Sequence, residues 1–188
     1  YERGWFSSTE TLVVRLKPTL LNNAQNYLPD NLKTVLSEPV TVVSRIKHGP
    51  FADGFAAAHA QSEFHYAPES EKVLKRFFGE RVPLTLGNTI NFDGSGRLNL
   101  HIPAFDYDEL SGIALNWKGL SGQTDYTAGW KTFKSGYTAP LLHIKLADKG
   151  DIVMEDLRIA SDTREGQGKL ALGSSSLTLG RLSLQWQQ

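Results

Sequence analysis

The chain has 188 residues, with 20 Lys and Arg against 20 Asp and Glu, and it contains no cysteine. Balanced charge without a long run of either sign argues against nucleic acid as a partner. The absence of cysteine excludes disulfides, thiolate metal sites and a cysteine nucleophile. No stretch approaches the roughly 20 apolar residues that a membrane-spanning helix needs. The length fits a single β-rich domain over residues 1–188.

The first third of the chain mixes strand and helix signals. Residues 6–16 alternate, which predicts an opening strand, and residues 19–36 show helical spacing interrupted by Pro29, which predicts short helical turns. Two further strands are expected at about Val40–Lys47 and Phe55–Tyr66. The opening strand would bury the apolar residues that share one parity, namely Phe6, Leu12, Val14 and Leu16.

Residues Pro68–Phe78 carry the clearest helix signal. Proline suits the first turn, acidic residues follow it, basic residues come near the end, and Gly79 stops the helix. The apolar residues fall on one side only, which must therefore lie on the sheet. This side consists of Val73, Leu74, Phe77 and Phe78.

From Pro83 to Trp186 the chain alternates apolar and polar residues in short segments separated by Gly, Asp and Ser. The clearest pair, joined by Asp93–Gly96, predicts a β-hairpin. In the last segment the apolar residues change parity, which predicts a bulge or break at Gly180–Arg181. The expected strands are Leu84–Phe92, Leu98–Ile102, Gly112–Trp117, Thr124–Lys131, Leu141–Ala147, Asp151–Ala160, Gly168–Leu172 and Ser176–Gln185.

These patterns together predict a mainly β protein with minor α structure, of the α+β class. We expect a large, twisted antiparallel sheet of eight or more strands with one amphipathic helix packed on it. Such a sheet supplies shape and surface, and the strand pattern contains no recognisable catalytic motif.

Few residues suggest chemistry. His59, Glu63 and His65 share one strand face. Residues two apart on a strand are separated by roughly 6.6 Å, so His59 and His65, six apart, are about 20 Å from each other and cannot share a metal ion. His48, beside Gly and Pro, is either a ligand contact or a turn histidine that bonds nearby backbone. We found no nucleophile elbow or phosphate loop. Carboxylates are numerous enough for a glycosidase-like pair, but most fall at turns, where Asp is expected for its local backbone hydrogen bonds. We therefore expect no catalytic residue, no metal and no cofactor.

Aromatic residues gather between Trp117 and Tyr137. Trp117, Tyr126 and Trp130 match the apolar parity of their expected strands, so we expect them in the core. Phe133 and Tyr137 stand in a Gly-containing connection and are the expected exposed pair. The candidate binding residues are therefore His48, Phe133 and Tyr137.

Three segments carry a family resemblance: the opening Tyr-Glu-Arg-Gly-Trp-Phe-Ser-Ser, then Ile46–Phe51 with its His-Gly-Pro-Phe, and the glycine-punctuated strands ending in Leu172–Leu177. With them the chain resembles the YdgA-like family of bacterial envelope proteins, a domain of unknown function, and it is more distantly similar to AsmA-like envelope proteins. The resemblance implies a periplasmic location and an inner-membrane anchor in the full-length protein. It also implies that these 188 residues are the N-terminal part of a longer periplasmic region.

The leading functional expectation is a non-enzymatic envelope domain that binds another protein or its own copies through an extended sheet. The alternatives are a lipid- or glycan-binding module, which needs apolar or aromatic residues on an accessible face, and, third, a hydrolase, which needs an acid-base group in a pocket. We expect self-association or an envelope protein or lipid as partner, and no nucleic acid.

Overall fold

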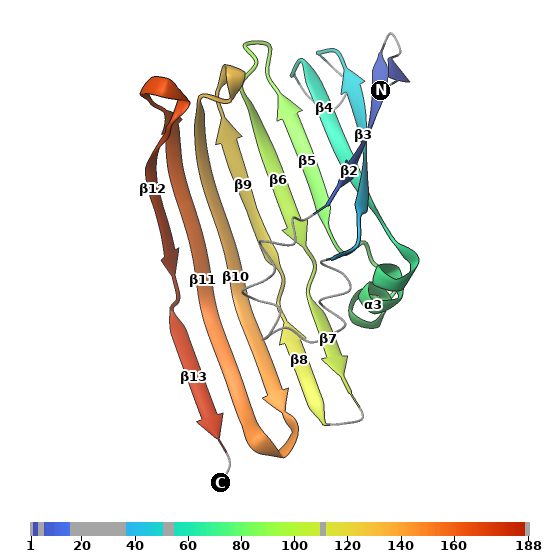
Figure 1. Ribbon diagram of the computed structural model, residues 1–188, viewed down its shortest axis with the longest axis vertical. Helices are drawn as coiled ribbons and strands as arrows, with labels where there is room; N and C mark the ends of the chain where they lie inside the picture. The colour runs from blue at the N-terminus through green and yellow to red at the C-terminus, as the bar shows by residue number, and fades with distance from the viewer. Residues whose placement is uncertain (1, 4–5, 16–36, 51–54, 110–111, 187–188) are drawn as a thin grey trace.

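The computed structural model describes residues 2–3, 6–15, 37–50, 55–109 and 112–186, which form a 13-stranded antiparallel sheet with helix α3 beside it (Figure 1). The elements are β1 (Glu2–Arg3), β2 (Ser7–Val14), β3 (Val40–His48), β4 (Ala58–Tyr66), α3 (Pro68–Phe78), β5 (Thr85–Ile90), β6 (Gly96–Ile102), β7 (Phe105–Asp108), β8 (Ile113–Trp117), β9 (Leu120–Tyr126), β10 (Thr132–Leu146), β11 (Gly150–Glu165), β12 (Ala171–Thr178) and β13 (Arg181–Trp186). Single 3-10 turns occupy Ala128–Trp130, Ala147–Lys149 and Gln167–Lys169.

Two parts of the sheet differ in width. The wide part has the order β1-β2-β3-β4-β5-β6-β9-β10-β11-β12. The narrow part consists of β7, β8 and β13 with the adjoining halves of β10 and β11. Strands β10 and β11 run through both parts, as Figure 1 shows.

The structure confirms the mainly β class and several elements. The hairpin around Asp93–Gly96 is β5–β6, and the helix spans Pro68–Phe78 as expected. The expected break in the last segment separates β12 from β13, with Gly180 between them. The expected turns at residues 19–36 lie outside the described residues.

Other expectations were wrong. The opening strand exposes Phe6, Leu12 and Val14, because β2 lies near the margin of the sheet with few neighbours. Phe92 falls in the β5–β6 turn and is also exposed. The strand expected over Thr124–Lys131 is β9, which ends at Tyr126 because the chain turns sharply at Gly129 and Trp130.

One transverse row of residues separates the wide part from the narrow part. The residues on either side of Gly119, Pro140 and Asp156 are paired between neighbouring strands. These three residues therefore lie opposite one another. Pro103 lies beside Gly119, and Gly180 donates its backbone N–H toward Asp156. Gly119 (φ 90°) and Asp156 (φ 53°) are in the left-handed region, and proline donates no ladder hydrogen bond. All five positions therefore interrupt regular strand geometry at one level.

The apolar residues of β10 change parity across this transverse row. They stand at the odd positions Phe133, Tyr137 and Ala139 before Pro140 and mainly at the even positions Leu142, Ile144 and Leu146 after it. Beyond the row burial does not alternate, since residues 141–144 of β10 and 151–155 of β11 are all half-buried. An irregular residue in a strand re-aims the side chains beyond it. The parity change expected at Gly180 thus has a counterpart in β10.

The helix packs against β7 through its apolar side, as expected. Phe77 contacts the rings of Phe105 and Tyr107 at centroid distances of 5.4 and 4.7 Å, and Phe78 contacts Phe105 at 4.9 Å. Ser70 at the helix start donates its hydroxyl and backbone N–H to Glu38. The helix therefore covers the margin of the narrow part formed by β7.

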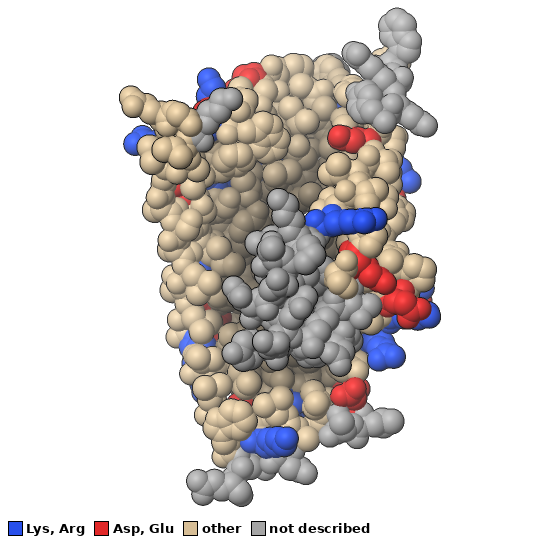
Figure 2. Space-filling model, viewed as in Figure 1, with Lys and Arg blue, Asp and Glu red and all other residues tan. Residues whose placement is uncertain are grey.

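The two faces of the wide part differ in charge. One row of the inner face holds Ile46, Ala60, Asn88, Leu98, Thr124, Ser135, Ser161 and Ser175, and the adjacent row of the outer face holds Arg45, Gln61, Gly87, Asn99 and Gln123. Among the described residues of β2 to β6 and β9 to β12 in the wide part, the charged or imidazole side chains at inner-face positions are those of Glu10, His48 and Glu165. Figure 2 shows the visible part of this face hollowed and nearly free of charged side chains.

The molecule is open rather than compact. Its accessible surface is 12956 Å², against about 9,000 Å² for a compact monomer of this mass. The buried apolar residues among those described are few: Ala56, Ala58, Phe78, Tyr126 and Ala139. None of the helices formed by described residues is long and apolar enough to cross a bilayer.

Candidate functional site

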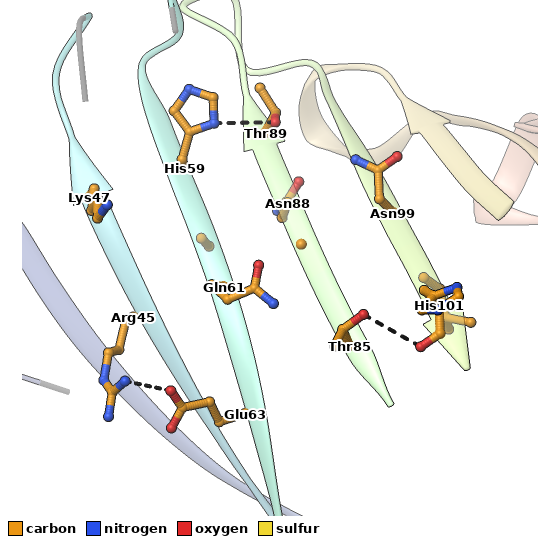
Figure 3. Close-up of a pocket in the computed structure, with 13 residues that line it drawn as sticks. Arg45, Lys47, His59, Gln61, Glu63, Thr85, Asn88, Thr89, Asn99 and His101 are labelled. Carbon is orange, nitrogen blue, oxygen red and sulfur yellow. Dashed lines mark hydrogen bonds and ion pairs between the residues drawn. The ribbon is translucent and has the colours of Figure 1, made fainter. Parts of the chain in front are cut away.

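A shallow polar hollow lies on the outer face over β3, β4, β5 and β6 (Figure 3). Its volume is about 600 Å³, and the alternation of each strand directs polar side chains into it. The side chains come from four adjacent strands and include Lys47, His59, Gln61, Thr89, Asn99 and His101. Such a surface can form hydrogen bonds with a polar ligand laid across the strands.

The charges around this hollow are paired. Arg45 donates to Glu63 on the neighbouring strand, and Arg97 donates to Asp125 at 2.5 Å. The hydrogen bond to Asp125 and its negative charge both raise the pKa of the Arg97 guanidinium. Exposed pairs of this kind contribute little to stability. They leave the outer face without a strong field of either sign.

His59 is the most enclosed polar group of the hollow. Its Nδ1 lies 3.3 Å from the Thr89 hydroxyl, and its Nε2 is buried without a hydrogen-bond partner among the described residues. Glu63 lies 3.9 Å from His65 on the same strand. No group of three metal-ligating side chains occurs in the part of the chain that the structure describes.

The three candidate binding residues lie on the inner face. His48 ends β3, and Phe133 and Tyr137 lie on β10, all at inner-face positions of the register. The expected exposure of Phe133 and Tyr137 was wrong: both are half-buried because they belong to a strand. Trp130, expected in the core, is more than half exposed at the turn. The structure thus gathers the three candidates on one surface without bringing them into contact.

His48 has a partner that the sequence did not reveal. Its Nε2 lies 2.9 Å from the Ser8 hydroxyl on the adjacent strand. A serine beside a histidine can form a nucleophile and base, yet Ser8 is only 4% exposed and is inaccessible to a substrate. This pair serves to hold β2 against β3.

A second histidine, His143, pairs with a carboxylate. Its Nε2 lies 2.8 Å from Asp151 Oδ1 across the β10–β11 hairpin. The register places His143 opposite Val153 and Asp151 opposite Lys145, so this is a diagonal pair that the sequence pattern did not mark. The Ser–His pair and the His–Asp pair belong to different parts of the sheet, so they do not combine into a triad.

The inner face satisfies many of its polar groups internally. Hydroxyl pairs cross between strands at Ser44–Ser62 (2.8 Å) and Thr124–Ser135 (2.9 Å). The Tyr126 hydroxyl donates to Asn88 at 3.0 Å. The inner face is therefore uncharged but not purely apolar, and it presents hydroxyls, aliphatic side chains and rings together.

Comparison with known proteins gives a family but no activity. The family model described as bacterial protein of unknown function (DUF945) matches residues 1–188. No curated protein matches the chain. No solved structure matches it either. The YdgA-like resemblance itself stays a prediction.

Proposed function

Because the chain belongs to this bacterial family of unknown function, which supplies no activity to carry over, we propose a role from the architecture. The chain is a non-enzymatic domain of the bacterial envelope that binds β-strands, including those of its own copies, at the β12–β13 edge of its sheet. The observation that carries the proposal is the chemistry of this edge. Strand edges with unpaired backbone groups recruit further strands unless they are protected.

The edge has almost no protection. Among the described residues, β12 and β13 pair only with β11, and every residue of the two strands except Ser183 is exposed. They contain no lysine or proline, and the one charged residue, Arg181, is engaged with Glu155 at 3.6 Å. Exposed apolar side chains project along the edge at Leu172, Leu177, Leu182, Leu184 and Trp186.

The other margins of the sheet differ from this edge. Strand β1 pairs with the start of β2 at Ser8 and Thr9, and helix α3 lies against β7. The described edge of β2 beyond Thr9 is also uncovered, but it is short, at residues 10–14, whereas β12 and β13 together form the longest described edge without a strand or helix on it. Backbone pairing supplies affinity in strand addition, and the alternate side chains supply specificity.

The envelope location rests on the resemblance of three segments: the opening Gly-Trp-Phe-Ser-Ser, the His-Gly-Pro-Phe and the glycine-punctuated strands. We propose a periplasmic location with an inner-membrane anchor in the full-length protein. The non-enzymatic role is supported by the separation of the Ser8–His48 and His143–Asp151 pairs. Turnover of any substrate by the purified protein that His48→Ala abolishes would overturn it.

Sedimentation velocity over a range of protein concentrations tests the edge. We expect a concentration-dependent increase in mass that Leu177→Lys with Leu184→Lys removes, because inward charges on an edge block pairing. Both leucines are at least half exposed, so the variant should retain its unfolding midpoint. The matched control is Asn99→Lys, an exposed residue on the central strand β6. A monomer at every concentration contradicts self-pairing.

A second candidate is a lipid- or glycan-binding module, favoured by the uncharged, hollowed inner face. Apolar surface with a few polar groups is typical of ligand sites. Mass spectrometry of protein extracted from a bacterial envelope would reveal a co-purifying lipid or glycan. Loss of that ligand in His48→Ala or Tyr137→Ala would assign it to this face.

A further inference from the structure

Five large apolar side chains stand exposed at one end of the sheet, each at a strand start or on a separate connection. We call them the apolar rim: Phe6 (81% exposed), Phe55 (78%), Phe92 (61%), Trp130 (52%) and Leu170 (67%). Scattered exposed apolar residues are ordinary, whereas a set confined to one end of a molecule indicates an interaction surface.

Backbone hydrogen bonds place the five positions at the same end, where Figure 1 shows the connections of the wide part. His48 N–H donates to Phe6 O at 2.8 Å, which brings the start of β2 to the end of β3. Glu165 N–H donates to Lys131 O at 2.6 Å, which joins the connection after Trp130 to the end of β11. A Cβ on Gly94 would lie 3.4 Å from Ala128 Cβ, so the β5–β6 and β9–β10 turns also adjoin.

Trp130 is held outward by its backbone. It has φ 59°, a conformation that a bulky side chain rarely adopts and that Gly or Asn would adopt readily. Its ring stacks on Tyr126 at a centroid distance of 4.1 Å and an interplanar angle of 12°. Tyr126 is itself buried and bonded to Asn88. The exposed Trp130 ring is thus supported by the buried Tyr126, and its backbone conformation is strained.

Phe92 has a similar support. It lies in the β5–β6 turn, where Ser95 donates its backbone N–H and hydroxyl to Asp93. Its ring contacts Phe55 at a centroid distance of 5.3 Å, so two connections present one aromatic pair. The rim therefore consists of ordered tips rather than loose side chains.

We propose that the apolar rim binds the surface of a lipid bilayer, with its side chains inserted at the level of the lipid headgroups. The five tips follow the sheet order from β2 to β12, roughly 35 Å at the usual strand spacing, with Phe55 against Phe92 and with Trp130 and Leu170 lining one shallow hollow. A row of this length exceeds one small ligand and suits an extended, fluid surface. Tryptophan and phenylalanine are the residues favoured at the bilayer interface.

Charge does not carry the proposal, because the rim bears both signs. Lys131 and Arg164 lie near Trp130, while Asp93 and Glu165 lie at the same end. Insertion of apolar groups must therefore supply the binding. The opposite end also exposes two large apolar side chains, Ile113 (37%) and Trp186 (63%), beside turns that include Glu109 and Lys149.

The test is co-sedimentation of the 188-residue chain with vesicles of phosphatidylethanolamine and phosphatidylglycerol. We expect the wild type to bind, and Phe92→Asn and Trp130→Asn each to weaken partitioning by about tenfold, the loss expected for removing one inserted aromatic ring. Asparagine tolerates the left-handed backbone of Trp130, so that variant should fold. The matched control is Val82→Asn, an apolar residue 57% exposed between α3 and β5 and outside both the rim and the β12–β13 edge, which should bind like the wild type.

Quenching of tryptophan fluorescence by brominated lipid gives a second readout. Quenching should decrease in Trp130→Asn and stay at the wild-type level in Val82→Asn. A wild type that does not bind vesicles overturns the proposal and leaves the rim as a protein-docking surface. Equal loss of binding in the Trp130 and Val82 variants also overturns it. Neither result depends on self-pairing at β12–β13, because Leu177→Lys with Leu184→Lys leaves the rim unchanged.

Discussion

The wide and narrow parts of the sheet are stabilised in different ways. In the narrow part, rings from helix α3 pack on Phe105 and Tyr107. In the wide part, hydroxyl and amide groups pair between strands, as at Ser44–Ser62 and Tyr126–Asn88. Removing a packed ring costs more free energy than removing one hydrogen bond. The comparison teaches that an open sheet can add helix packing at one margin while strand ladders, polar pairs and local ring contacts such as Tyr126–Trp130 maintain the rest.

The largest effect should come from Phe77→Asp in the narrow part. We expect a loss of about 3–5 kcal/mol in the free energy of unfolding, because the change removes two ring contacts and places a carboxylate beside Phe105. Urea denaturation followed by circular dichroism measures it. Phe77→Leu, the matched control, should lose clearly less. An unchanged midpoint for Phe77→Asp would show that the helix does not stabilise the narrow part.

An intermediate effect is expected at the transverse row between the parts, from Gly119→Ala. Gly119 has φ 90°, and a Cβ there would lie 2.9 Å from the Ile102 carbonyl oxygen. The left-handed backbone of a non-glycine residue and the close contact with the carbonyl oxygen together predict a loss of about 2–3 kcal/mol in unfolding free energy. Gly129→Ala is the matched control, since Gly129 is also left-handed (φ 69°) but meets only a flexible lysine at 3.8 Å.

Thermal unfolding of the two glycine variants checks this prediction. The Gly129 variant should lose about 1 kcal/mol, the ordinary cost of a left-handed non-glycine residue. Equal losses in both variants would mean that backbone conformation alone matters and that the row is not closely packed. The transverse row would then not be a structural boundary between the wide and narrow parts.

The smallest effect should come from Tyr126→Phe in the wide part. The ring stays buried and stacked on Trp130, and only the hydroxyl bond to Asn88 is lost. We expect a loss of about 1 kcal/mol in unfolding free energy, measured by urea denaturation. A loss as large as that of Phe77→Asp would show that the polar pairs, and not the rings, dominate the stability of the sheet.

The alternation of apolar and polar residues determined much of the fold. It placed the β5–β6 hairpin, because successive side chains point to opposite faces whatever the neighbours are. The bounds of Pro68–Phe78 followed from a proline at the start and a glycine after the end. The parity change near Gly180 predicted an interruption, because a regular strand cannot change its buried face.

The candidate residues were harder to predict. Parity identified Trp130 as a core residue, but its exposure depends on a turn at Gly129 that alternation does not register. Phe133 and Tyr137 were expected in a connection because Ser135 and Gly136 interrupt the apolar pattern between them. Strand β10 continues through that stretch because β9 and β11 pair with it on both sides.

By itself, the sequence determined where the helix lies and most of the strand segments, since these depend on local periodicity and capping, but it missed β7 and the first half of β10. Only the tertiary structure decided which strands are neighbours. It thereby aligned Pro103, Gly119, Pro140, Asp156 and Gly180 in one row and brought five apolar tips to one rim. Strand order depends on contacts between residues far apart in the chain, and local sequence patterns do not encode those contacts.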